Sequence, residues 1–356
     1  MPPSPRSLLL ALAAGLALAA AGPAAAQSAS APTPKEASPG LDPTLLGSVL
    51  QRAAALPRLH ALIIAHDGVT VVERAFHGPG LDQPVNIKSA SKTVMSALVG
   101  IAIEHRVFTD VDQPIAPIFA GFLPPTPDPL LGRITIDHLL SMRAGLDRTS
   151  GPNYSRWTQS ADWVRYILAQ PFVDQPGGGM LYSTGDTHLL SAALTRVTGR
   201  STLALMRDWL GGPLGIAIPA WPRDPQGIYV GGNDMRLSPR ALLRLGELYR
   251  HDGMVGGRRV LPQGWVQASW TPRTRSPHSG HAYGYGWFIT AARGHPVYYA
   301  WGFGGQMLYV VPDLGLTVVM TSNPAAPSND GYVQDLHGLL ADGIVAAAEA
   351  AGKPAI

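Results

Sequence analysis

The sequence predicts an α/β (α+β) domain in which both ends of the chain form one antiparallel sheet flanked by helices, with an all-α lobe inserted between them. Two β-rich runs lie at 61–66 and 69–76, and four more lie between 283 and 322. The segment between these groups alternates helical patterns with loops rich in Pro and Gly. Strands at both ends with helices between them are typical of a sheet built from the two termini.

The first half of the domain opens with a hairpin. Its two β-rich runs are joined by Asp67-Gly68, a dipeptide typical of a tight turn between strands. Residues 93–105 are apolar nearly all round, so we expect a central, buried helix there. Further helical patterns cover 135–142, 160–169, 187–197 and 201–210.

The second half returns to β structure. A helix is predicted at 238–252, with Ser238 as its N-cap and Pro239 in its first turn. Strands are then predicted at 283–290, 297–300, 306–311 and 316–322, with a turn at 312–315, and a final helix at 329–348.

The first forty residues predict export. Residues 1–6 carry one positive charge, 7–22 form an apolar run of Leu and Ala, and three alanines precede Gln27. This pattern is typical of a secretory signal peptide over 1–26, cleaved near Ala26–Gln27, and the run is too short for a membrane span. We therefore expect a periplasmic or secreted protein.

The rest of the chain divides into a linker and one domain. Residues 27–40 are rich in Ser, Ala and Pro and predict a disordered linker. The stretch 41–350 is long enough for one large core or two closely packed lobes. We expect the α/β lobe at about 41–88 and 230–350, and the α lobe at about 89–229.

Composition excludes several functions. The net charge is only +3 without a basic cluster, so nucleic acid and anionic membranes are not expected partners. The absence of cysteine excludes disulfides, thiol catalysis and Cys-ligated metals. The eleven histidines form no His-x-x-x-His or His-x-His pair, so we expect neither a metal nor another cofactor. An α/β-hydrolase would need a Gly-x-Ser-x-Gly elbow, which is missing from the sequence.

Ser89-Ala90-Ser91-Lys92 is the only Ser-x-x-Lys in the chain. A spacing of three residues at a helix start places Ser89 and Lys92 within reach of each other and points free N–H groups at the serine. Only four of the 27 basic residues are lysines, and two of the four, Lys88 and Lys92, adjoin Ser89. Lysine can act as a neutral base where arginine cannot. The alternative is a serine N-cap followed by a surface lysine.

Two later motifs strengthen the chemical interpretation. Tyr182-Ser183-Thr184 leads into a helix, where the two outer hydroxyls can relay a proton and hold a substrate; alternatively, the tyrosine only packs at the helix entrance. The stretch 301–306 (Trp-Gly-Phe-Gly-Gly-Gln) predicts a glycine-rich strand whose N–H groups line an oxyanion hole, or else a merely twisted strand.

The order of these three motifs resembles the β-lactamase-related serine hydrolases of the penicillin-binding superfamily. That group includes class C β-lactamases, DD-peptidases, family VIII carboxylesterases and 6-aminohexanoate-dimer hydrolases. The stretches 134–146, 231–249 and 283–287 are also similar to the family's sequences, and the resemblance runs in order from about 56 to 323. It implies the β-lactamase-like fold.

The resemblance also implies roles for individual residues. Ser89 would form the acyl-enzyme, and Lys92 and Tyr182 would share the acid and base work. The N–H of Ser89 and that of Gln306 or Gly305 would bind the oxyanion. Other positions implied to bind substrate are Gly304, Phe303, Thr184 and Trp301. Two of these depart from the family pattern: Thr184 stands where many members have Asn, and Phe303 where β-lactamases have Lys.

The predicted function is hydrolysis of a small-molecule ester or amide through an acyl-enzyme. The alternatives are a β-lactamase or DD-peptidase, and a non-catalytic recognition module of the same fold. The apolar Phe303 predicts a preference for uncharged acyl groups, unless an arginine such as Arg236 or Arg293 supplies the charge that the family's lysine carries.

Overall fold

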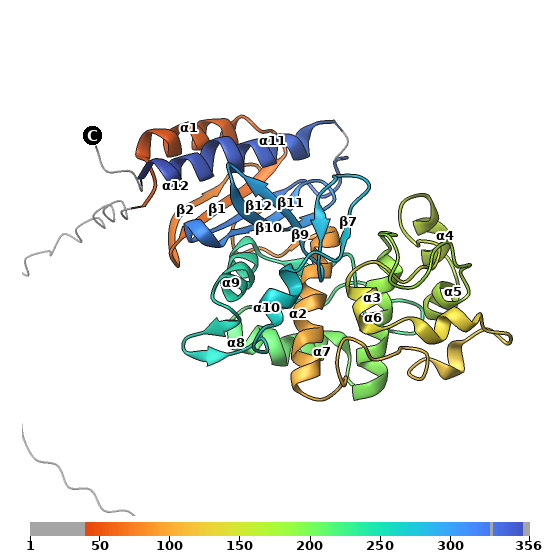
Figure 1. Cartoon of the computed structure of the whole chain (residues 1–356). Coiled ribbons are helices and arrows are strands. Elements are labelled where there is room, and N and C mark those ends of the chain that lie inside the picture. The colour runs from red at the N-terminus through yellow and green to blue at the C-terminus, as the bar shows by residue number, and fades with distance from the viewer. Residues whose placement is uncertain (1–39, 328–329, 352–356) are drawn as a thin grey trace, which may run out of the picture. The chain divides into compact units, whose positions relative to one another are not determined.

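A computed structural model describes residues 40–327 and 330–351; the predicted signal peptide and nearly all of the predicted linker lie outside them. The predicted fold class is confirmed. Strands from both ends of the described chain form one eight-stranded antiparallel sheet in the order β2-β1-β12-β11-β10-β9-β8-β7 (Figure 1). The strands of this sheet are β1 (Leu59–His66), β2 (Val69–Ala75), β7 (Thr274–Arg275), β8 (Ala282–Tyr283), β9 (Phe288–Ala292), β10 (His295–Gly302), β11 (Gln306–Val311) and β12 (Leu316–Ser322).

Helices cover both faces of the sheet (Figure 1). One face carries α1 (Pro43–Ala54) and the C-terminal helix, which consists of α11 (Tyr332–Gly338), a π-helical stretch (Leu339–Val345) and α12 (Ala346–Ala351). The other face carries α2 (Ser91–Glu104), α9 (Pro239–Arg250) and α10 (Trp265–Trp270). Two apolar cores result, because strand side chains alternate between the faces: Leu62 packs toward α1 and Ile63 toward α2.

The helical part of the chain lies between α2 and α9. It holds α3 (Ile136–Leu140), α4 (Tyr154–Thr158), α5 (Trp163–Leu168), α6 (Thr184–Thr198), α7 (Thr202–Met206), a π-helical stretch (Arg207–Gly211) and α8 (Gly212–Leu214). Short 3₁₀ turns span Lys88–Ala90, Ala120–Phe122, Pro129–Arg133, Gly151–Asn153 and Pro312–Leu314. Two small ladders pair β3 (Val85–Asn86) with β4 (Arg236–Leu237), and β5 (Met254–Val255) with β6 (Arg258–Arg259). The β3–β4 ladder joins the chain before Ser89 to the chain before α9.

The predicted strand at 283–290 is wrong as one continuous element. The chain leaves the sheet after Tyr283 and returns at Phe288. The intervening turn lies directly on α2: Thr93 Oγ1 donates to the carbonyl of Gly286, and a Cβ at Gly286 would lie 2.7 Å from the carbonyl oxygen of Lys92. Gly286 also has a φ of +73°, which glycine adopts readily.

The predicted glycine-rich strand over 301–306 is also wrong. β10 ends at Gly302, β11 begins at Gln306, and the three residues between them form a tight turn. Gly304 and Gly305 have φ values of +81° and +93°, so the glycines serve the turn and not a flat strand.

The two ends of the domain differ from the prediction in detail. α1 was not predicted, although Asp42 caps it by accepting from the N–H of Leu45 and Pro43 occupies its first turn. The C-terminal helix begins at Tyr332 instead of residue 329, which lies outside the described residues. Within the described ranges, we find no helix with the length and apolar character needed to cross a membrane.

Candidate active site

Ser89 lies at the junction between the β3–β4 ladder and α2. It belongs to a 3₁₀ turn (Lys88–Ala90) whose hydrogen bonding starts with the N–H of Ala90, which donates to the carbonyl of Ile87 at 3.1 Å. The N–H of Ser89 comes one residue earlier in the chain, before the hydrogen bonding of the turn begins. Lys88 has a φ of +50°, an uncommon value for a residue with a side chain, and its N–H donates to Asn86 Oδ1 at 2.8 Å. Such backbone strain is often found beside a reacting group.

Lys92 follows one turn later on α2 and is 1 % exposed. Its Nζ lies 3.2 Å from Ser89 Oγ, 3.3 Å from Thr184 Oγ1 and 2.7 Å from the carbonyl oxygen of Gly232. That last approach requires glycine, because a Cβ at Gly232 would lie 1.9 Å from Thr187 Oγ1. The structure therefore brings the first two predicted motifs together around one buried amine.

The electrostatics of Lys92 favour its neutral form. Burial lowers the pKa of Lys92 to about 7, opposed by the negative charges of Asp186 and Asp234. Asp186 is itself buried, and burial raises the pKa of its carboxyl to about 8. Near neutral pH a substantial fraction of Lys92 can therefore accept a proton, which an exposed lysine cannot do.

Tyr182 and Thr184 lie on either side of this amine. The ring centroid of Tyr182 is 4.9 Å from Lys92 Nζ, and burial raises the pKa of the tyrosine to about 12, opposed by its hydrogen bond with Ser89. Thr184 Oγ1 lies 2.9 Å from Ser150 Oγ, which also accepts from the N–H of Thr184 at 2.8 Å. Hydroxyl groups thus continue from the amine of Lys92 through Thr184 to Ser150.

Two hollows open on either side of Ser89. The first, about 190 Å³, is lined mainly by aromatic rings, those of Tyr182, Phe288, Trp301 and Phe303. The second, about 480 Å³, has most of the polar side chains beside Ser89 in its lining: the cations Lys88 and Arg148, and the hydroxyls of Ser150, Tyr154 and Thr184. We call these the aromatic pocket and the polar pocket.

Three of the predicted substrate-binding residues line neither pocket. A Cβ at Gly304 would lie 2.5 Å from the carbonyl oxygen of Asn323, so Gly304 packs against the loop after β12. A Cβ at Gly305 would meet Leu336 of α11. The Gln306 side chain is buried and bonds with the backbone of Ser322. The N–H of Gly305 donates to the carbonyl of Gly302 at 3.1 Å, so it is already used within the turn.

A comparison with protein-family models shows to which family the chain belongs. A protein-family model named Beta-lactamase matches residues 59–342. The chain belongs to the beta-lactamase family. Its members are hydrolases, in agreement with the three motifs and with the expected fold. No curated protein sequence matches the chain.

Solved structures show the same fold at low sequence identity. A Bacillus anthracis protein assigned as a 6-aminohexanoate-dimer hydrolase is 19% identical, with a TM-score of 0.69 over 85% of this chain and 81% of its own. A Bacteroides dorei protein assigned as a beta-lactamase is 19% identical, with a TM-score of 0.70 over 86% and 99%. EstCE1, a hydrolase with promiscuous acyltransferase activity, is 19% identical, with a TM-score of 0.67 over 83% and 97%.

Sequence reasoning missed several residues at this site. Ser150 contacts Thr184, Gly232 contacts Lys92, and Asp186 interacts electrostatically with Lys92. These groups meet only because distant segments fold together. Gly232 was visible in the sequence as part of a Gly-Gly pair, and Asp186 as the residue four positions after Tyr182, but neither pattern indicates a role by itself. Arg148 gave no signal.

The arginines considered from the sequence do not enter the site. Arg293 bonds with Glu349 beyond the end of β9, and Arg236 is exposed on β4; neither lines a pocket beside Ser89. Arg148, between α3 and α4, does line the polar pocket. In the part of the chain that the structure describes, its guanidinium makes no hydrogen bond or ion pair.

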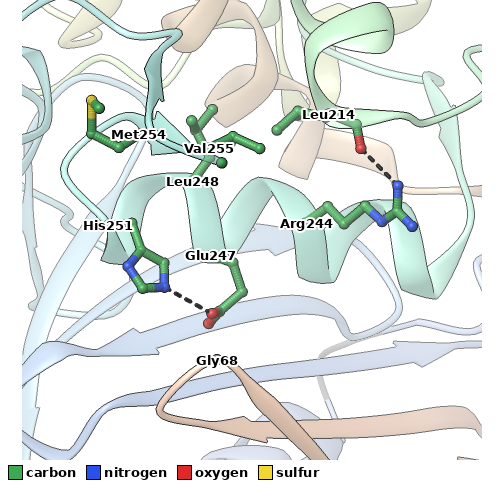
Figure 2. Close-up of a pocket in the computed structure, with 10 residues that line it drawn as sticks. Gly68, Leu214, Arg244, Glu247, Leu248, His251, Met254 and Val255 are labelled. Carbon is green, nitrogen blue, oxygen red and sulfur yellow. Dashed lines mark hydrogen bonds and ion pairs between the residues drawn. The ribbon is translucent and has the colours of Figure 1, made fainter.

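A further pocket lies on α9, away from Ser89. Figure 2 shows its polar side chains, which are Arg244, Glu247 and His251. Arg244 donates to the carbonyl of Leu214 at 2.7 Å, and the carboxylate of Glu247 lies 3.4 Å from His251 Nε2. We call it the α9 pocket. Across residues 40–327 and 330–351, no cluster of three or more His, Asp or Glu is placed to hold a metal.

Proposed function

We propose that this protein is a serine hydrolase that cleaves an ester or amide through an acyl-enzyme on Ser89. The observation that carries the proposal is the buried amine of Lys92, which lies 3.2 Å from Ser89 Oγ and has a pKa of about 7. A serine hydroxyl becomes a good nucleophile when a neighbouring base removes its proton. A neutral lysine in this position can serve as that base.

The first half of the reaction follows from this geometry. Lys92 takes the hydroxyl proton while Ser89 Oγ attacks the substrate's carbonyl carbon and forms a tetrahedral intermediate. We assign the N–H of Ser89 as one oxyanion donor. The N–H of Phe303 is the second, because it donates no hydrogen bond among the described residues and its residue lines both pockets. The bond to the leaving group then breaks, and the proton held by Lys92 passes to that group.

The second half repeats these steps with water. Lys92 takes a proton from water, the resulting hydroxide attacks the acyl carbon, and Ser89 leaves with the returned proton. Tyr182, with a pKa of about 12, stays protonated through the neutral range and donates a hydrogen bond to the reacting oxygens. We therefore assign the base role to Lys92 and a donor role to Tyr182.

The substrate is proposed to be an ester or amide with an uncharged acyl group. The rings of Phe288, Trp301 and Phe303 offer an apolar surface, and Phe303 is 49% exposed at the opening. A carboxylate placed against these rings would lose its water without gaining a charged donor. The fold neighbours named as a 6-aminohexanoate-dimer hydrolase and as a hydrolase with promiscuous acyltransferase activity are consistent with this class.

A fluorophosphonate probe tests the nucleophile. We expect one covalent adduct, located by peptide mass spectrometry on Ser89, and none in Ser89→Ala. A hydrolysis screen of p-nitrophenyl esters, amide oligomers, D-amino-acid amides and nitrocefin then defines the bond type. A wild-type protein that takes up no probe would be a recognition module and not a hydrolase.

Export is a separate proposal, which rests on the sequence of residues 1–26. We propose that this segment directs secretion and is removed near Gln27. N-terminal sequencing of protein recovered outside the cytoplasm should begin at or near Gln27. Recovery from the cytoplasm with residues 1–26 intact would contradict the proposal.

A further inference from the structure

Of the charged groups that line the polar pocket, Arg148 is the one without a partner among the described residues. Lys88, the other cation there, lies 3.4 Å from Asp234, and Asn233 donates to Tyr154 at 2.9 Å. The Arg148 guanidinium is half-buried and, among the described residues, makes no hydrogen bond or ion pair. Its neighbour Asp147 accepts from Asn153 at 3.4 Å instead.

A half-buried guanidinium without a partner is suited to bind an anion. Arginine presents several N–H donors in a fixed plane that matches a carboxylate, and it keeps its charge at any working pH. Arg148 lines the same pocket as Ser89, so an anion held there belongs to the molecule being cleaved. The loop between α3 and α4 therefore supplies a charge that the β10–β11 turn, with Phe303, does not.

The hydroxyl groups indicate which part of the substrate lies in this pocket. Lys92 contacts Thr184, which contacts Ser150, and both hydroxyl residues line the polar pocket but not the aromatic pocket. The leaving group must receive the proton that Lys92 takes from Ser89. The leaving group therefore occupies the polar pocket, and the acyl group occupies the aromatic pocket.

We propose that Arg148 is a specificity-determining residue that binds a carboxylate on the leaving group. The preferred substrates are then short, uncharged acyl groups joined through an ester or amide to a hydroxy acid or amino acid. This inference rests on the proposed function of Ser89. It extends that function by assigning opposite charge preferences to the two sides of the scissile bond.

The test uses matched substrates that differ in one charge. 3-Butyryloxybenzoate carries a carboxylate on its leaving group, and 3-butyryloxybenzamide is its neutral counterpart. We expect wild-type kcat/KM to favour the carboxylate by about tenfold to a hundredfold, the usual range for a charged hydrogen bond. Arg148→Gln should remove this preference by lowering kcat/KM for the benzoate toward that for the benzamide.

Three controls make the result decisive. Arg156→Gln, at an exposed arginine on α4 that lines neither pocket, should leave the preference intact. A carboxylate on the acyl side, in p-nitrophenyl hydrogen glutarate, should be disfavoured against p-nitrophenyl pentanoate regardless of Arg148. Thermal unfolding of Arg148→Gln should match wild type, because the guanidinium makes no hydrogen bond or ion pair with residues 40–327 and 330–351 that would be lost.

The outcomes separate this inference from the proposed function. Hydrolysis that depends on Ser89 but shows an unchanged carboxylate preference in Arg148→Gln would overturn the role of Arg148 alone. A wild-type preference for the benzamide, or an Arg148-dependent preference for the glutarate, would overturn the assignment of the two pockets. Hydrolysis of both esters by Ser89→Ala at the wild-type rate would overturn the proposed function itself.

Discussion

The polar pocket beside Ser89 and the α9 pocket have nearly the same volume, about 480 and 490 Å³, and both contain charged side chains. They differ in how those charges are satisfied. In the α9 pocket, Arg244 bonds with the carbonyl of Leu214 (Figure 2) and with that of Gly215. Glu247 there is held by Arg250 and Thr317. Around Ser89, by contrast, the Arg148 guanidinium has no partner among the described residues.

Buried groups near Ser89 also lack partners. Lys92 is buried with carbonyl and hydroxyl oxygens around its amine but makes no ion pair within the described chain, and Asp186 Oδ2 has no hydrogen-bond partner there. An unsatisfied buried polar group costs about 1–3 kcal/mol. Volume alone therefore does not distinguish the two pockets. The charged and polar groups left without a partner near Ser89 do, and strongly perturbed titratable groups such as Lys92 gather at functional sites.

The largest expected effect is that of Ser89→Ala. Without the hydroxyl no acyl-enzyme forms, so kcat/KM should fall by at least about a thousandfold while the melting temperature stays near that of wild type. The matched control is His251→Ala in the α9 pocket, which should retain full activity. Comparable losses in the two variants would remove the distinction between the pockets.

Lys92→Arg should be nearly as damaging as Lys92→Ala. Arginine stays protonated at working pH, and we expect a loss of about a hundredfold or more in kcat. The control is Lys88→Arg, which keeps the charge opposite Asp234 and should stay close to wild-type activity. If Lys92→Arg retained most of the activity, the amine would be an electrostatic support and Tyr182 the base.

Asp186→Asn should move the pH profile without abolishing activity. The rate should rise with pH as Lys92 loses its proton, with a midpoint near 7 in wild type. Asp186 ionises as pH rises toward its pKa of about 8, and its charge then favours the protonated form of Lys92. Its removal should therefore lower the pKa of Lys92 and shift the midpoint to lower pH. The measurement is kcat/KM against pH for both proteins; an unchanged midpoint, with only a lower plateau, would indicate a purely structural carboxyl.

The smallest effect on activity is expected in the α9 pocket, where Glu247→Gln should change stability instead. Burial alone would raise the pKa of Glu247, but hydrogen bonds from Arg250 and Thr317 lower it below 4.5. A lowered pKa stabilises the fold above pH 4.5 and loses that effect as pH falls through the folded-state value. We expect the variant to lose about 1–3 kcal/mol of unfolding free energy at pH 7, with a difference that shrinks in acid. A loss of kcat of similar size to that of Lys92→Arg would contradict this assignment.

The sequence predicts the parts of this molecule that depend on local patterns. The hairpin at Asp67-Gly68, the buried helix after Ser89 and the Ser238 cap all follow from turn chemistry, apolar patterning or capping, and the structure contains each of them. The contact between Ser89 and Lys92 follows from a helical spacing of three residues. These features need no knowledge of distant segments.

The errors arise where tertiary contacts override local patterns. The stretch around Gly286 has a strand-like composition, yet it turns because it must approach the backbone of α2. Gly304 and Gly305 suggest a strand against a ligand, yet they form a turn that packs against the loop after β12 and against α11. Arg148 belongs to the site only because the fold brings the α3–α4 loop to the same pocket as Ser89.

The central claim is that the groups around Ser89 carry out acyl transfer, and trapping the intermediate tests it most directly. Wild-type protein is mixed with p-nitrophenyl butyrate, quenched in acid within milliseconds, and digested for mass spectrometry, with Ser89→Ala and His251→Ala in parallel. We predict a burst of p-nitrophenol together with a butyryl group on Ser89 in wild type and His251→Ala, and neither in Ser89→Ala. Rapid turnover with no acylated peptide, or a butyryl group on a different residue, would contradict the account.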